Sequence, residues 1–586
     1  MKILAIHDGH NASAAFLKNG EVIAAIQEER LTRDKNQGGF PEQSIKEILE
    51  IANCNLDDVD KIVFCGFGVI NHKTREDVMG SYTKKFNFQH KNVIKKIEDQ
   101  VRKYRDSVFP GLKKNKRKKH LKRKQEQRMQ PLFEKGVTRE RISFIDHHLC
   151  HAATAYYGQP DMENKILVLT CDGAGDYLSA SVRIGQKGRL EKLGDVSQDD
   201  SVPILYSFVT YLMGFVPLEH EYKLMGLAPY AKGGQQSREI CEYFKSLFRF
   251  TKENPFGWER CEGVPSTFDM GPVLRDVMQY KRFDQIAGGL QAFIEDFFVE
   301  WVQRVVAETK IHKLALAGGL FMNVKLNKKI MEMPEVESLY VFPSCGDESI
   351  SIGAAWASHA ESTQGDVNIP ALGATYWSKE FSKEEVDKAI KNYKFTKKVK
   401  IEPVEDIEKR CAQLLADGQI VARCKGKMEF GARALGNRSI LADPGSWQTI
   451  HVINAMIKQR DFWMPFAPSM MAEYADDYIV NPKNIKSPYM ILSFDSKKEI
   501  LPEIIAAVHP YDGSCRPQVV EKDINPDYHR LIDNYRQLTG KAVVLNTSFN
   551  LHGFPVVYSP KDALDVFDKS GLKYLALENF LVQEIE

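Results

Sequence analysis

Three histidines stand within a few residues of one another in the first half of the chain. The residue types from Asp146 onwards favour a helix that begins at this aspartate, and on a helix His147 and His151 share one face. Two imidazoles at this spacing can bind one metal ion. His148 and His151 form a competing pair, and histidines that only pack or hydrogen-bond show the same spacing. The pattern alone leaves both interpretations open.

A metal site also needs hard ligands from elsewhere in the chain. Asp347, in a loop at the end of a predicted strand, is the candidate third ligand, and Asp172, after another predicted strand, is a candidate fourth. Imidazoles combined with carboxylates suit iron(II), manganese or zinc. We therefore treat these four residues as a candidate site for one divalent metal ion.

Glycine-rich turns follow several predicted strands. One contains Asp172, Gly173 and Gly175, and another is Gly318-Gly319. Glycine lets backbone N–H groups approach phosphate oxygens, and a following helix favours the anion. An ordinary tight turn explains each of them alone. Together they indicate a nucleotide cleft in which Asp172 positions a metal-bound phosphate.

The last third of the chain contains a dense cationic loop, Lys425–Ser439. Its two arginines, Arg433 and Arg438, stand among glycines, with Lys425 and Lys427 just before them. Guanidinium groups bind phosphate or carboxylate in a bidentate manner. The loop therefore predicts an anion site, and structural salt bridges of the arginines are the alternative.

Four amide and hydroxyl side chains come directly after the predicted strand Ala542–Leu545. They are Asn546, Thr547, Ser548 and Asn550. Such groups can orient a small polar substrate. Capping of a loop by the same side chains is the alternative interpretation.

An α/β framework must bring these residues together. Lys2–Ile6 is an apolar strand, and Asn19-Gly20 favours a type I′ turn in the hairpin that follows. The same unit, a strand with an Asp-Gly turn and a β-meander, returns from Lys165–Leu169 onwards. We therefore expect two related α/β lobes that face one cleft.

The chain is too long for one hydrophobic core. It has 586 residues, whereas single cores stop growing at about 250–300 residues. The polar stretch Glu361–Ala374 is the predicted boundary between a domain at 1–360 and a mixed α/β domain at 375–586. Ser382 and Glu385 form a capping box at the start of the first helix beyond it.

The composition is that of a globular protein. Charged residues make up 27% and the formal net charge is +2, which excludes a disordered or fibrous chain and a global field for nucleic acid or membrane. No window approaches the roughly 20 apolar residues of a membrane span. The ten cysteines are dispersed and favour reduced thiols, so we expect a cytoplasmic protein.

One segment is strongly basic. Lys113–Lys124 carries nine lysines and arginines in twelve positions, inside an insertion at about 95–130. Binding of nucleic acid or another polyanion is one interpretation. We favour a solvated helix hairpin inserted into the first lobe, because aromatic residues for base stacking are absent there.

Together these residues resemble the O-carbamoyltransferase family of nodulation-factor and antibiotic biosynthesis, including enzymes of the tobramycin type. The resemblance covers nearly the whole chain. The motifs that carry it are Asp8–Ala14, Glu28-Glu29-Arg30, the H-x-x-x-H helix, Lys223–Tyr230, Gly318-Gly319, Met428–Ser439 and Asn546–Asn550. The family usually has proline at the position of Ala432, a departure that loosens one turn and leaves both arginines.

The resemblance implies a fold and a reaction. The larger N-terminal domain would be a duplicated actin/sugar-kinase-type ATPase domain, like the universal threonylcarbamoyl-transfer protein. The smaller mixed α/β domain would resemble the threonylcarbamoyl-adenylate synthase. Carbamoyl phosphate and ATP, with Mg²⁺, would give carbamoyl-adenylate in the second domain, and the carbamoyl group would pass to a substrate hydroxyl in the first.

The resemblance also implies roles for individual residues. His147, His151 and Asp347 match the metal ligands, with iron(II) as the first choice of metal. His10 matches the histidine that deprotonates the acceptor hydroxyl, a task that suits a neutral imidazole. Lys35 is a candidate nucleotide contact. The residues that fall in the carbamoyl-phosphate and adenylate region are Arg433, Arg438, Asn546, Thr547, Ser548 and Asn550.

The acceptors implied by the family are sugars, aminoglycosides, macrocycles and guanidinium alkaloid toxins. Two alternatives are carbamoylation of tRNA, which the basic segment keeps open, and a nucleotide-dependent scaffold without turnover. Arg433, Arg438 and Asn546–Asn550 favour catalysis, because a plain ATPase switch does not need them. We expect no nucleic-acid or membrane partner, and a homodimer is the default oligomer.

Overall fold

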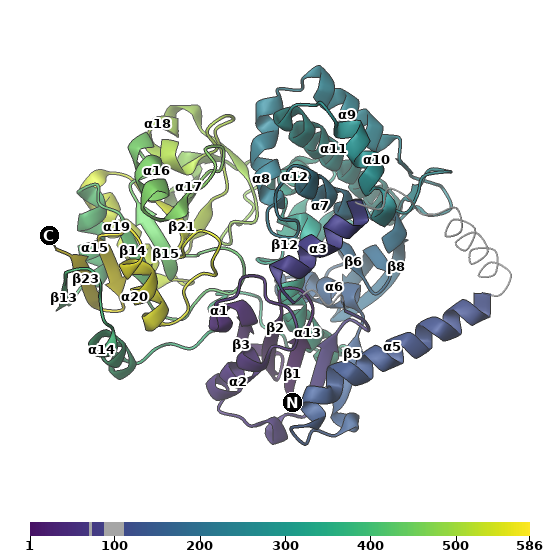
Figure 1. Ribbon diagram of the computed structural model, residues 1–586, viewed down its shortest axis with the longest axis horizontal. Helices are drawn as coiled ribbons and strands as arrows, with labels where there is room; N and C mark the ends of the chain where they lie inside the picture. Colours follow the sequence, from purple (N-terminus) through teal and green to yellow (C-terminus); the bar gives the residue numbers. More distant parts are fainter. Residues whose placement is uncertain (70–72, 87–109, 586) are drawn as a thin grey trace.

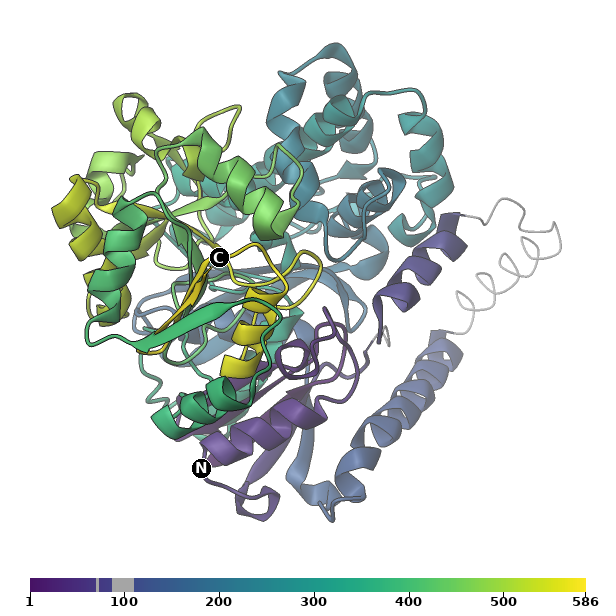
Figure 2. The ribbon, with the colours of Figure 1, turned by 60° about the vertical axis from the view of Figure 1, so that its left-hand side comes forward.

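The computed structural model describes residues 1–69, 73–86 and 110–585 (Figure 1). The part of the predicted basic insertion before residue 110 lies outside these described residues. Two bodies lie side by side in Figure 1: the N-terminal part, in purple to teal, and the C-terminal part, in green to yellow. Figure 2 shows the same two parts from another side.

The first lobe is built on a five-stranded sheet of order β3-β2-β1-β4-β5. Its strands are β1 (Lys2–His7), β2 (Ser13–Lys18), β3 (Glu21–Gln27), β4 (Lys61–Cys65) and β5 (Ile142–Ile145). Strands β1, β2 and β3 form an antiparallel meander, and β4 and β5 add parallel strands beside β1. Asn19 and Gly20 both have positive φ, as the predicted type I′ turn requires. Two helices accompany this sheet, α1 (Glu28–Thr32) and α2 (Glu42–Ile51).

The second lobe repeats this arrangement. Its sheet has the order β8-β7-β6-β11-β12, again an antiparallel meander followed by two parallel strands. Its strands are β6 (Ile166–Gly175), β7 (Leu178–Gln186), β8 (Arg189–Ser197), β11 (Lys313–Ala317) and β12 (Ser338–Val341). The equal strand order confirms the predicted duplication and the actin/ATPase-like fold of the N-terminal part.

Two equivalent helices, α6 (His147–Gly158) and α13 (Ile350–Ser362), lie between the sheets and pack against each other. Helix α6 follows β5 but packs on β6 and β11, whereas α13 follows β12 but packs on β1 and β2. A Cβ atom added at Gly353 would lie 1.9 Å from the carbonyl oxygen of Cys150, so the helix backbones touch there. The N-terminus of each helix therefore faces the cleft between the lobes.

A helical layer follows the second meander. Its central helix, α11 (Phe283–Thr309), places Trp301 fully in the core. The helices around it are α7 (Pro203–Leu212), α8 (Glu221–Leu227), α9 (Gln235–Lys245), α10 (Gly271–Met278) and α12 (Val324–Glu332). A short ribbon, β9 (Phe248–Arg249) with β10 (Glu259–Arg260), accompanies this layer.

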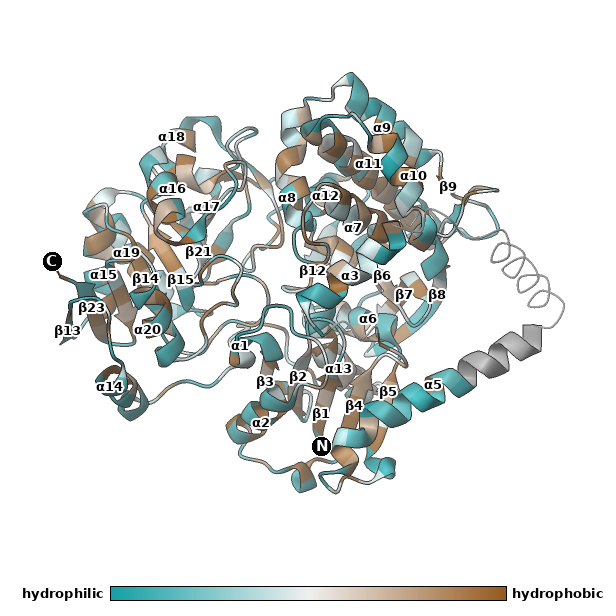
Figure 3. Ribbon diagram, viewed as in Figure 1, coloured by the Kyte–Doolittle hydropathy of each residue, from teal (hydrophilic) through white to brown (hydrophobic). Residues whose placement is uncertain are grey.

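Helix α3 (Arg75–Phe86) precedes the basic insertion, and the described part of the insertion lies in α5 (Pro110–Phe133). Figures 1 and 2 show α5 running out from the body beside the first sheet. Figure 3 shows the strands of the sheets as mainly hydrophobic. The part of α5 that is coloured there is mainly hydrophilic. Lys119, Lys122 and Arg123 on this helix are exposed, which fits a solvated helix.

The C-terminal part is a mixed α/β unit around an eight-stranded sheet of order β13-β23-β22-β14-β15-β21-β16-β20. These strands are β13 (Val399–Pro403), β14 (Val421–Cys424), β15 (Arg438–Ala442), β16 (Ala467–Met471), β20 (Gln518–Val520), β21 (Val543–Ser548), β22 (Tyr574–Leu577) and β23 (Phe580–Glu584). Asn546, Thr547 and Ser548 were predicted to follow this strand, but β21 continues to Ser548 and contains all three.

Helices and a small second sheet surround this eight-stranded sheet. The helices are α14 (Lys383–Asn392), α15 (Ile407–Ala416), α16 (Trp447–Ile453), α17 (Ala475–Tyr478), α18 (Leu501–Ile504), α19 (Pro526–Thr539) and α20 (Pro560–Asp568). The second sheet contains β17 (Ile479–Val480), β18 (Phe494–Ser496) and β19 (Ser514–Cys515). Ser382 and Glu385 form the predicted capping box at α14. Within the described residues, every helix is too short or too polar to cross a membrane.

Candidate metal site and cationic pocket

Four predicted ligands meet at the N-termini of α6 and α13. The Nε2 atom of His147 lies 3.3 Å from Oδ2 of Asp172 and 3.5 Å from Oδ1 of Asp347. The Nε2 atom of His151 lies 3.3 Å from the same Asp347 oxygen. One ligand atom from each of the four residues falls within 4.8 Å of the others. The fold thus brings together Asp172 of β6, Asp347 at the start of a 3₁₀ turn, and two histidines of α6.

Local structure explains how each ligand is held. The Asp146 side chain caps α6 by accepting a hydrogen bond from the N–H of Leu149, 2.8 Å away. A Cβ atom at Gly175 would lie 2.0 Å from the ring of His147, so glycine leaves the space that this imidazole fills. The N–H of Gly319 donates to Oδ1 of Asp172, at 3.2 Å. Both predicted glycine segments therefore shape the ligand cluster, but Asp172, Gly173 and Gly175 lie within the long strand β6 and not in a turn after it.

The electrostatics of the cluster are those of cation ligands. Burial alone would lower the pKa of His147, but the carboxylates of Asp347 and Asp172 raise it to about 10. Burial would raise the pKa of Asp347, but the nearby imidazoles of His147 and His151 hold it far below its usual range. In both residues the charged partner outweighs burial.

Unpartnered polar atoms test whether this cluster fits a metal ion. The buried Nε2 of His151 and Oδ1 of Asp347 have no hydrogen-bond partner among the described residues. Buried polar atoms without partners are rare, and here they point at each other across 3.3 Å. His148 instead turns to Oγ1 of Thr170, 3.0 Å away. The pair His147 and His151, and not His148, therefore fits a divalent cation.

The turn between β1 and β2 carries His10. Its backbone carbonyl accepts a hydrogen bond from Nε2 of His7, at 2.9 Å. Burial lowers the pKa of His7, whereas the charge of Asp347 raises it, so this histidine also lies near the ligand cluster. His7 was missed by sequence reasoning, because a polar residue that ends a strand carries no pattern of its own.

The C-terminal part contains a second cluster, made of one buried lysine and three half-buried arginines. Its members are Arg433, Lys458, Arg460 and Arg516, and we call them the cationic pocket. Burial lowers the pKa of Arg433 to about 10. Burial also lowers the pKa of Arg516 well below its usual value, and the nearby charges of Arg433 and Arg460 lower it further. Within the described part of the chain, none of the four forms an ion pair with a carboxylate.

Neutral side chains of β21 and the loop after it hold the pocket. The Nζ atom of Lys458 donates to Oδ1 of Asn550 at 2.7 Å and to Oγ of Ser548 at 3.1 Å. Arg460 donates to Oγ1 of Thr547 at 3.2 Å. The predicted polar run thus lies beside cations that sequence reasoning missed. Lys458 and Arg460 stand in a short charged stretch without glycines, which gave no signal of an anion site.

Lys458 also ends an unusual turn. Residues Asn454–Lys458 form one turn of π-helix, and Gln459 follows with φ 45°. Such turns are rare in proteins, and those that occur are often found at functional sites. Burial lowers the pKa of Lys458 well below its usual value, and Arg460 and Lys35 lower it further. Lys35 of the first lobe therefore lies near this pocket.

Arg438 and Asn546 are placed differently. Arg438 is fully buried in β15, where its guanidinium donates to the carbonyl oxygens of Tyr558, Gly426 and Asn437 at 2.9–3.1 Å. These contacts give Arg438 a structural role, and its part in anion binding stays a prediction. Asn546 donates to the carbonyl of Ala434 at 3.1 Å, directly after Arg433 in the chain.

The cationic pocket and the metal-ligand cluster adjoin across the two parts of the chain. Arg433 is close enough to Cys345 and Glu348, which flank Asp347, to interact with them electrostatically. A Cβ atom at Gly431 would lie 2.5 Å from the Ser344 side chain. Arg30 of the first lobe donates to the carbonyl of Gly431 at 2.8 Å. The arginine loop is therefore packed against the loop that bears a metal ligand.

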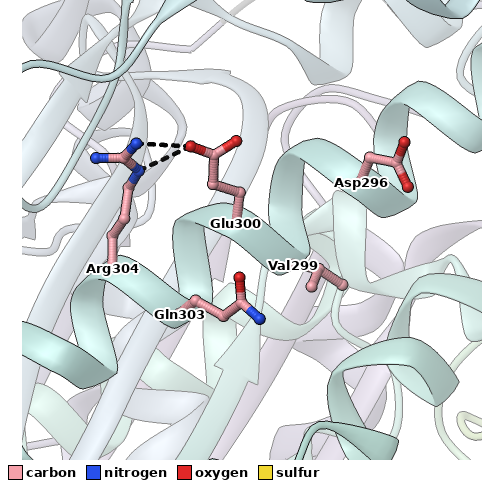
Figure 4. A pocket seen from close by; sticks show the side chains of 5 residues that line it. All are labelled: Asp296, Val299, Glu300, Gln303 and Arg304. Carbon is pink, nitrogen blue, oxygen red and sulfur yellow. Dashed lines mark hydrogen bonds and ion pairs between the residues drawn. The ribbon is translucent and has the colours of Figure 1, made fainter.

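A hollow on the outer face of α11 contains neither of the two clusters described above (Figure 4). It is lined by Asp296, Val299, Glu300, Gln303 and Arg304, all from one helix. The Arg304 guanidinium pairs with Glu300 at 2.7 Å, one helical turn away. Asp296 pairs with Lys245 of α9 at 2.9 Å, so each charged side chain of the hollow has a partner, and no predicted site residue lies in it. The chemistry belongs to the cleft and the cationic pocket.

The duplicated N-terminal part thus holds a cluster of cation ligands, and the mixed α/β C-terminal part adds a cluster of cations beside it. Residues 2–356 match the family "Carbamoyltransferase N-terminus", and residues 412–584 match "Carbamoyltransferase C-terminus". The chain therefore belongs to the carbamoyltransferase family, and it is a transferase.

Individual relatives agree with this family. The chain is 30% identical to the nodulation protein NolNO of Sinorhizobium fredii, across 98% of this chain and 79% of NolNO. It is 30% identical to the 3'-hydroxymethylcephem-O-carbamoyltransferase of Amycolatopsis lactamdurans, across 47% of this chain and 49% of that protein. A solved structure of full-length HypF in its phosphate- and nucleotide-bound form is 12% identical, with a TM-score of 0.31, across 63% of this chain and 56% of HypF.

Proposed function

We propose that this protein uses carbamoyl phosphate and ATP to carbamoylate a hydroxyl group of a small natural product, such as an aminoglycoside, a sugar, a macrocycle or a guanidinium toxin. Residues 375–586 would form carbamoyl-adenylate, as a domain of the threonylcarbamoyl-adenylate-synthase type. Residues 1–360 would transfer the carbamoyl group. Atom balance in the first step requires one water molecule and releases phosphate from carbamoyl phosphate and pyrophosphate from ATP.

The observation that carries this proposal is the cationic pocket. Lys458 is buried and Arg433, Arg460 and Arg516 are half-buried. Burial lowers the pKa of all four, and cations shielded from water without a counter-charge are costly, so an anionic ligand is their natural partner. Carbamoyl phosphate and carbamoyl-adenylate are compact anions whose phosphate oxygens accept bidentate hydrogen bonds from arginine. The hydroxyl and amide groups beside Lys458 and Arg460 would orient the neutral carbamoyl end.

The transfer step would take place at the ligand cluster. His147, His151, Asp172 and Asp347 would hold a divalent ion, with iron(II) as first choice and manganese or zinc as alternatives. Such an ion polarises a carbonyl or clamps phosphate oxygens when bound.

The residues around this cluster would supply the remaining roles. His10, in the turn after β1, would accept the proton of the acceptor hydroxyl, because a neutral imidazole is a suitable base near neutral pH. Lys35 and the glycine segments at Gly173, Gly175, Gly318 and Gly319 would contact ATP and its Mg²⁺. The hydroxyl oxygen would attack the carbamoyl carbon, and AMP would leave.

The test is the consumption of ATP in the presence of carbamoyl phosphate. Purified protein should release pyrophosphate only when both are present, and labelled carbamoyl phosphate should add its carbamoyl mass to an alcohol in a screen. His10→Ala should keep pyrophosphate release and lose transfer, whereas Arg433→Ala should lose both. ATP binding without consumption that depends on carbamoyl phosphate would contradict the proposal and favour a scaffold.

We further propose a cytoplasmic location, a possible homodimer and no nucleic-acid partner. All ten cysteines are free, which suits a reducing compartment. Steep salt-dependent binding of tRNA would contradict the last point and revive a tRNA-modifying role.

A further inference from the structure

The segment Lys223–Tyr230 has no part in the site described above, although it is one of the family-like motifs. It forms most of α8 and the 3₁₀ turn after it, Ala228–Ala231. Helix α11 packs behind both elements. A Cβ atom at Gly288 of α11 would lie 2.3 Å from Cβ of Ala231, so this support is tight. The motif therefore stands on the rigid core of the N-terminal part.

The front of the motif contacts the C-terminal part. The Nζ atom of Lys223 lies 3.0 Å from Oδ2 of Asp461, and the lysine side chain is only 11% exposed. The same ammonium group lies 5.1 Å from the ring centre of Phe215, within cation–π distance. The indole N–H of Trp463 donates to the carbonyl of Lys223 at 3.2 Å. Two residues of one C-terminal loop thus converge on one lysine.

The rest of the motif continues this contact. Nε2 of His509 donates to the carbonyl of Gly226 at 2.7 Å. A Cβ atom at Gly226 would lie 3.2 Å from the sulfur of Met464, which explains the absence of a side chain. The ring of Tyr230 lies 5.9 Å from that of Phe462. Every turn of the motif therefore contacts the loop that starts after Arg460 or the segment at His509.

The loop that is held in this way carries the pocket cations. Asp461 directly follows Arg460, and Lys458 lies three residues before Asp461. Between them, Gln459 has φ 45°, a backbone conformation that a side-chain-bearing residue rarely adopts. The ordinary hydrogen-bond ladder of a helix does not fix this stretch, because it is a single π-turn followed by a left-handed residue. Contacts from outside must position Lys458 and Arg460.

We propose that Lys223 is a positioning residue, which through its ion pair with Asp461 fixes the loop that presents Lys458 and Arg460 to the anionic donor. The cationic pocket is then assembled correctly only when the two parts of the chain are docked on each other through the Lys223–Tyr230 motif. This inference rests on the proposed function of the pocket as the donor site.

A charge-swap cycle tests the proposal. The full-length variants Lys223→Glu, Asp461→Lys and Lys223→Glu/Asp461→Lys are compared with wild type. The first readout is amide hydrogen exchange over residues 454–464, which needs no ligand. The second is the dissociation constant for inorganic phosphate, measured by calorimetry. Each single variant should change both readouts by about tenfold, the scale of coupling between residues in contact, and the double variant should recover most of the loss.

A matched control is Lys328→Glu. Lys328 of α12 forms an ion pair with Asp495 of β18, 2.9 Å away, which also joins the two parts of the chain. This variant should leave both readouts at wild-type values. Lys223→Met, which removes the charge without reversing it, should show a smaller change in the same direction and guards against misfolding of Lys223→Glu.

The double variant and the exchange measurement decide between these possibilities. Additive effects in the double variant, or unchanged exchange over 454–464 in the single variants, would overturn the proposal. Recovery in the double variant by both readouts supports it. If wild type binds no phosphate, the proposed function of the pocket fails, whereas the exchange measurement still decides whether Lys223 positions the loop.

Discussion

Arg128 of α5 donates a bidentate pair of hydrogen bonds to Asp8, which directly follows β1. Nη2 lies 2.7 Å from Oδ1, and Nε lies 2.9 Å from Oδ2. Both side chains are buried, and the guanidinium also donates to the carbonyls of Gly66 and Cys65. In the duplicated fold, Asp8 occupies the place that Asp172 occupies in the second lobe. The first aspartate is neutralised by an arginine, so only the second is available for a cation.

We expect Arg128→Ala to destabilise the protein strongly. It leaves the carboxylate of Asp8 buried without a partner, which lowers the free energy of unfolding by about 3–5 kcal/mol. Denaturant unfolding measures the loss. Arg123→Ala, an exposed position on the same helix, should stay within about 0.5 kcal/mol of wild type. Equal stability of the two variants would mean that the Asp8 contact is dispensable.

The contact between α6 and α13 gives a second prediction. Gly353→Ala places a methyl group where the Cys150 carbonyl lies, and such overpacking costs about 1–3 kcal/mol. Because the metal ligands sit at the starts of these helices, the variant should also hold less metal, as measured by elemental analysis. Gly80→Ala in α3, where no atom lies within 4 Å, should keep both stability and metal content. Full metal content in Gly353→Ala would show that the contact between the two helices does not affect metal binding.

Metal binding itself is the third prediction. Protein loaded with iron(II), manganese or zinc and then dialysed should retain one ion per chain. His151→Ala and Asp347→Ala should each weaken metal binding by at least about tenfold. Each variant removes a ligand, and even the loss of a residue that only orients a ligand costs about that much. His148→Gln should retain the ion, since His148 faces Thr170. Loss of metal in His148→Gln with retention in His151→Ala would show that the other histidine pair binds.

The fourth prediction concerns Lys458. Its folded pKa lies below the unfolded value, so the buried charge reduces stability at neutral pH, and stability rises as the pH increases towards the unfolded pKa. Lys458→Met should therefore make the ligand-free protein more stable by about 1–3 kcal/mol at neutral pH. It should also weaken phosphate binding about tenfold or more, the value of a charge-assisted hydrogen bond.

The pH dependence of wild type follows from the same shift. Phosphate affinity should fall as the pH rises through the lowered pKa of Lys458, before an ordinary lysine would lose its proton. Calorimetry in buffers of different ionisation enthalpy should detect proton uptake on binding in that range. Affinity that is independent of pH up to the normal lysine range would contradict the role of Lys458.

Local patterns in the sequence predicted much of the fold. Apolar strands and the Asn19-Gly20 turn predicted both meanders. Such signals are local, because a turn type and a strand period depend only on neighbouring residues. The helix that begins at Asp146 and the capping box at Ser382 are equally local. The family resemblance extended these signals to the reaction class.

The tertiary structure alone decided which residues meet. Spacing could not choose between His148 and His151; the packing of α6 against α13 and β6 turned His147 and His151 towards Asp347. Arg433 and Arg438 look alike in sequence, yet one lies in the cationic pocket and the other is tied to backbone carbonyls inside β15. Lys458, Arg460 and Arg516 joined that pocket without any local motif, because convergence of distant side chains depends on how sheets and loops pack and not on their order in the chain.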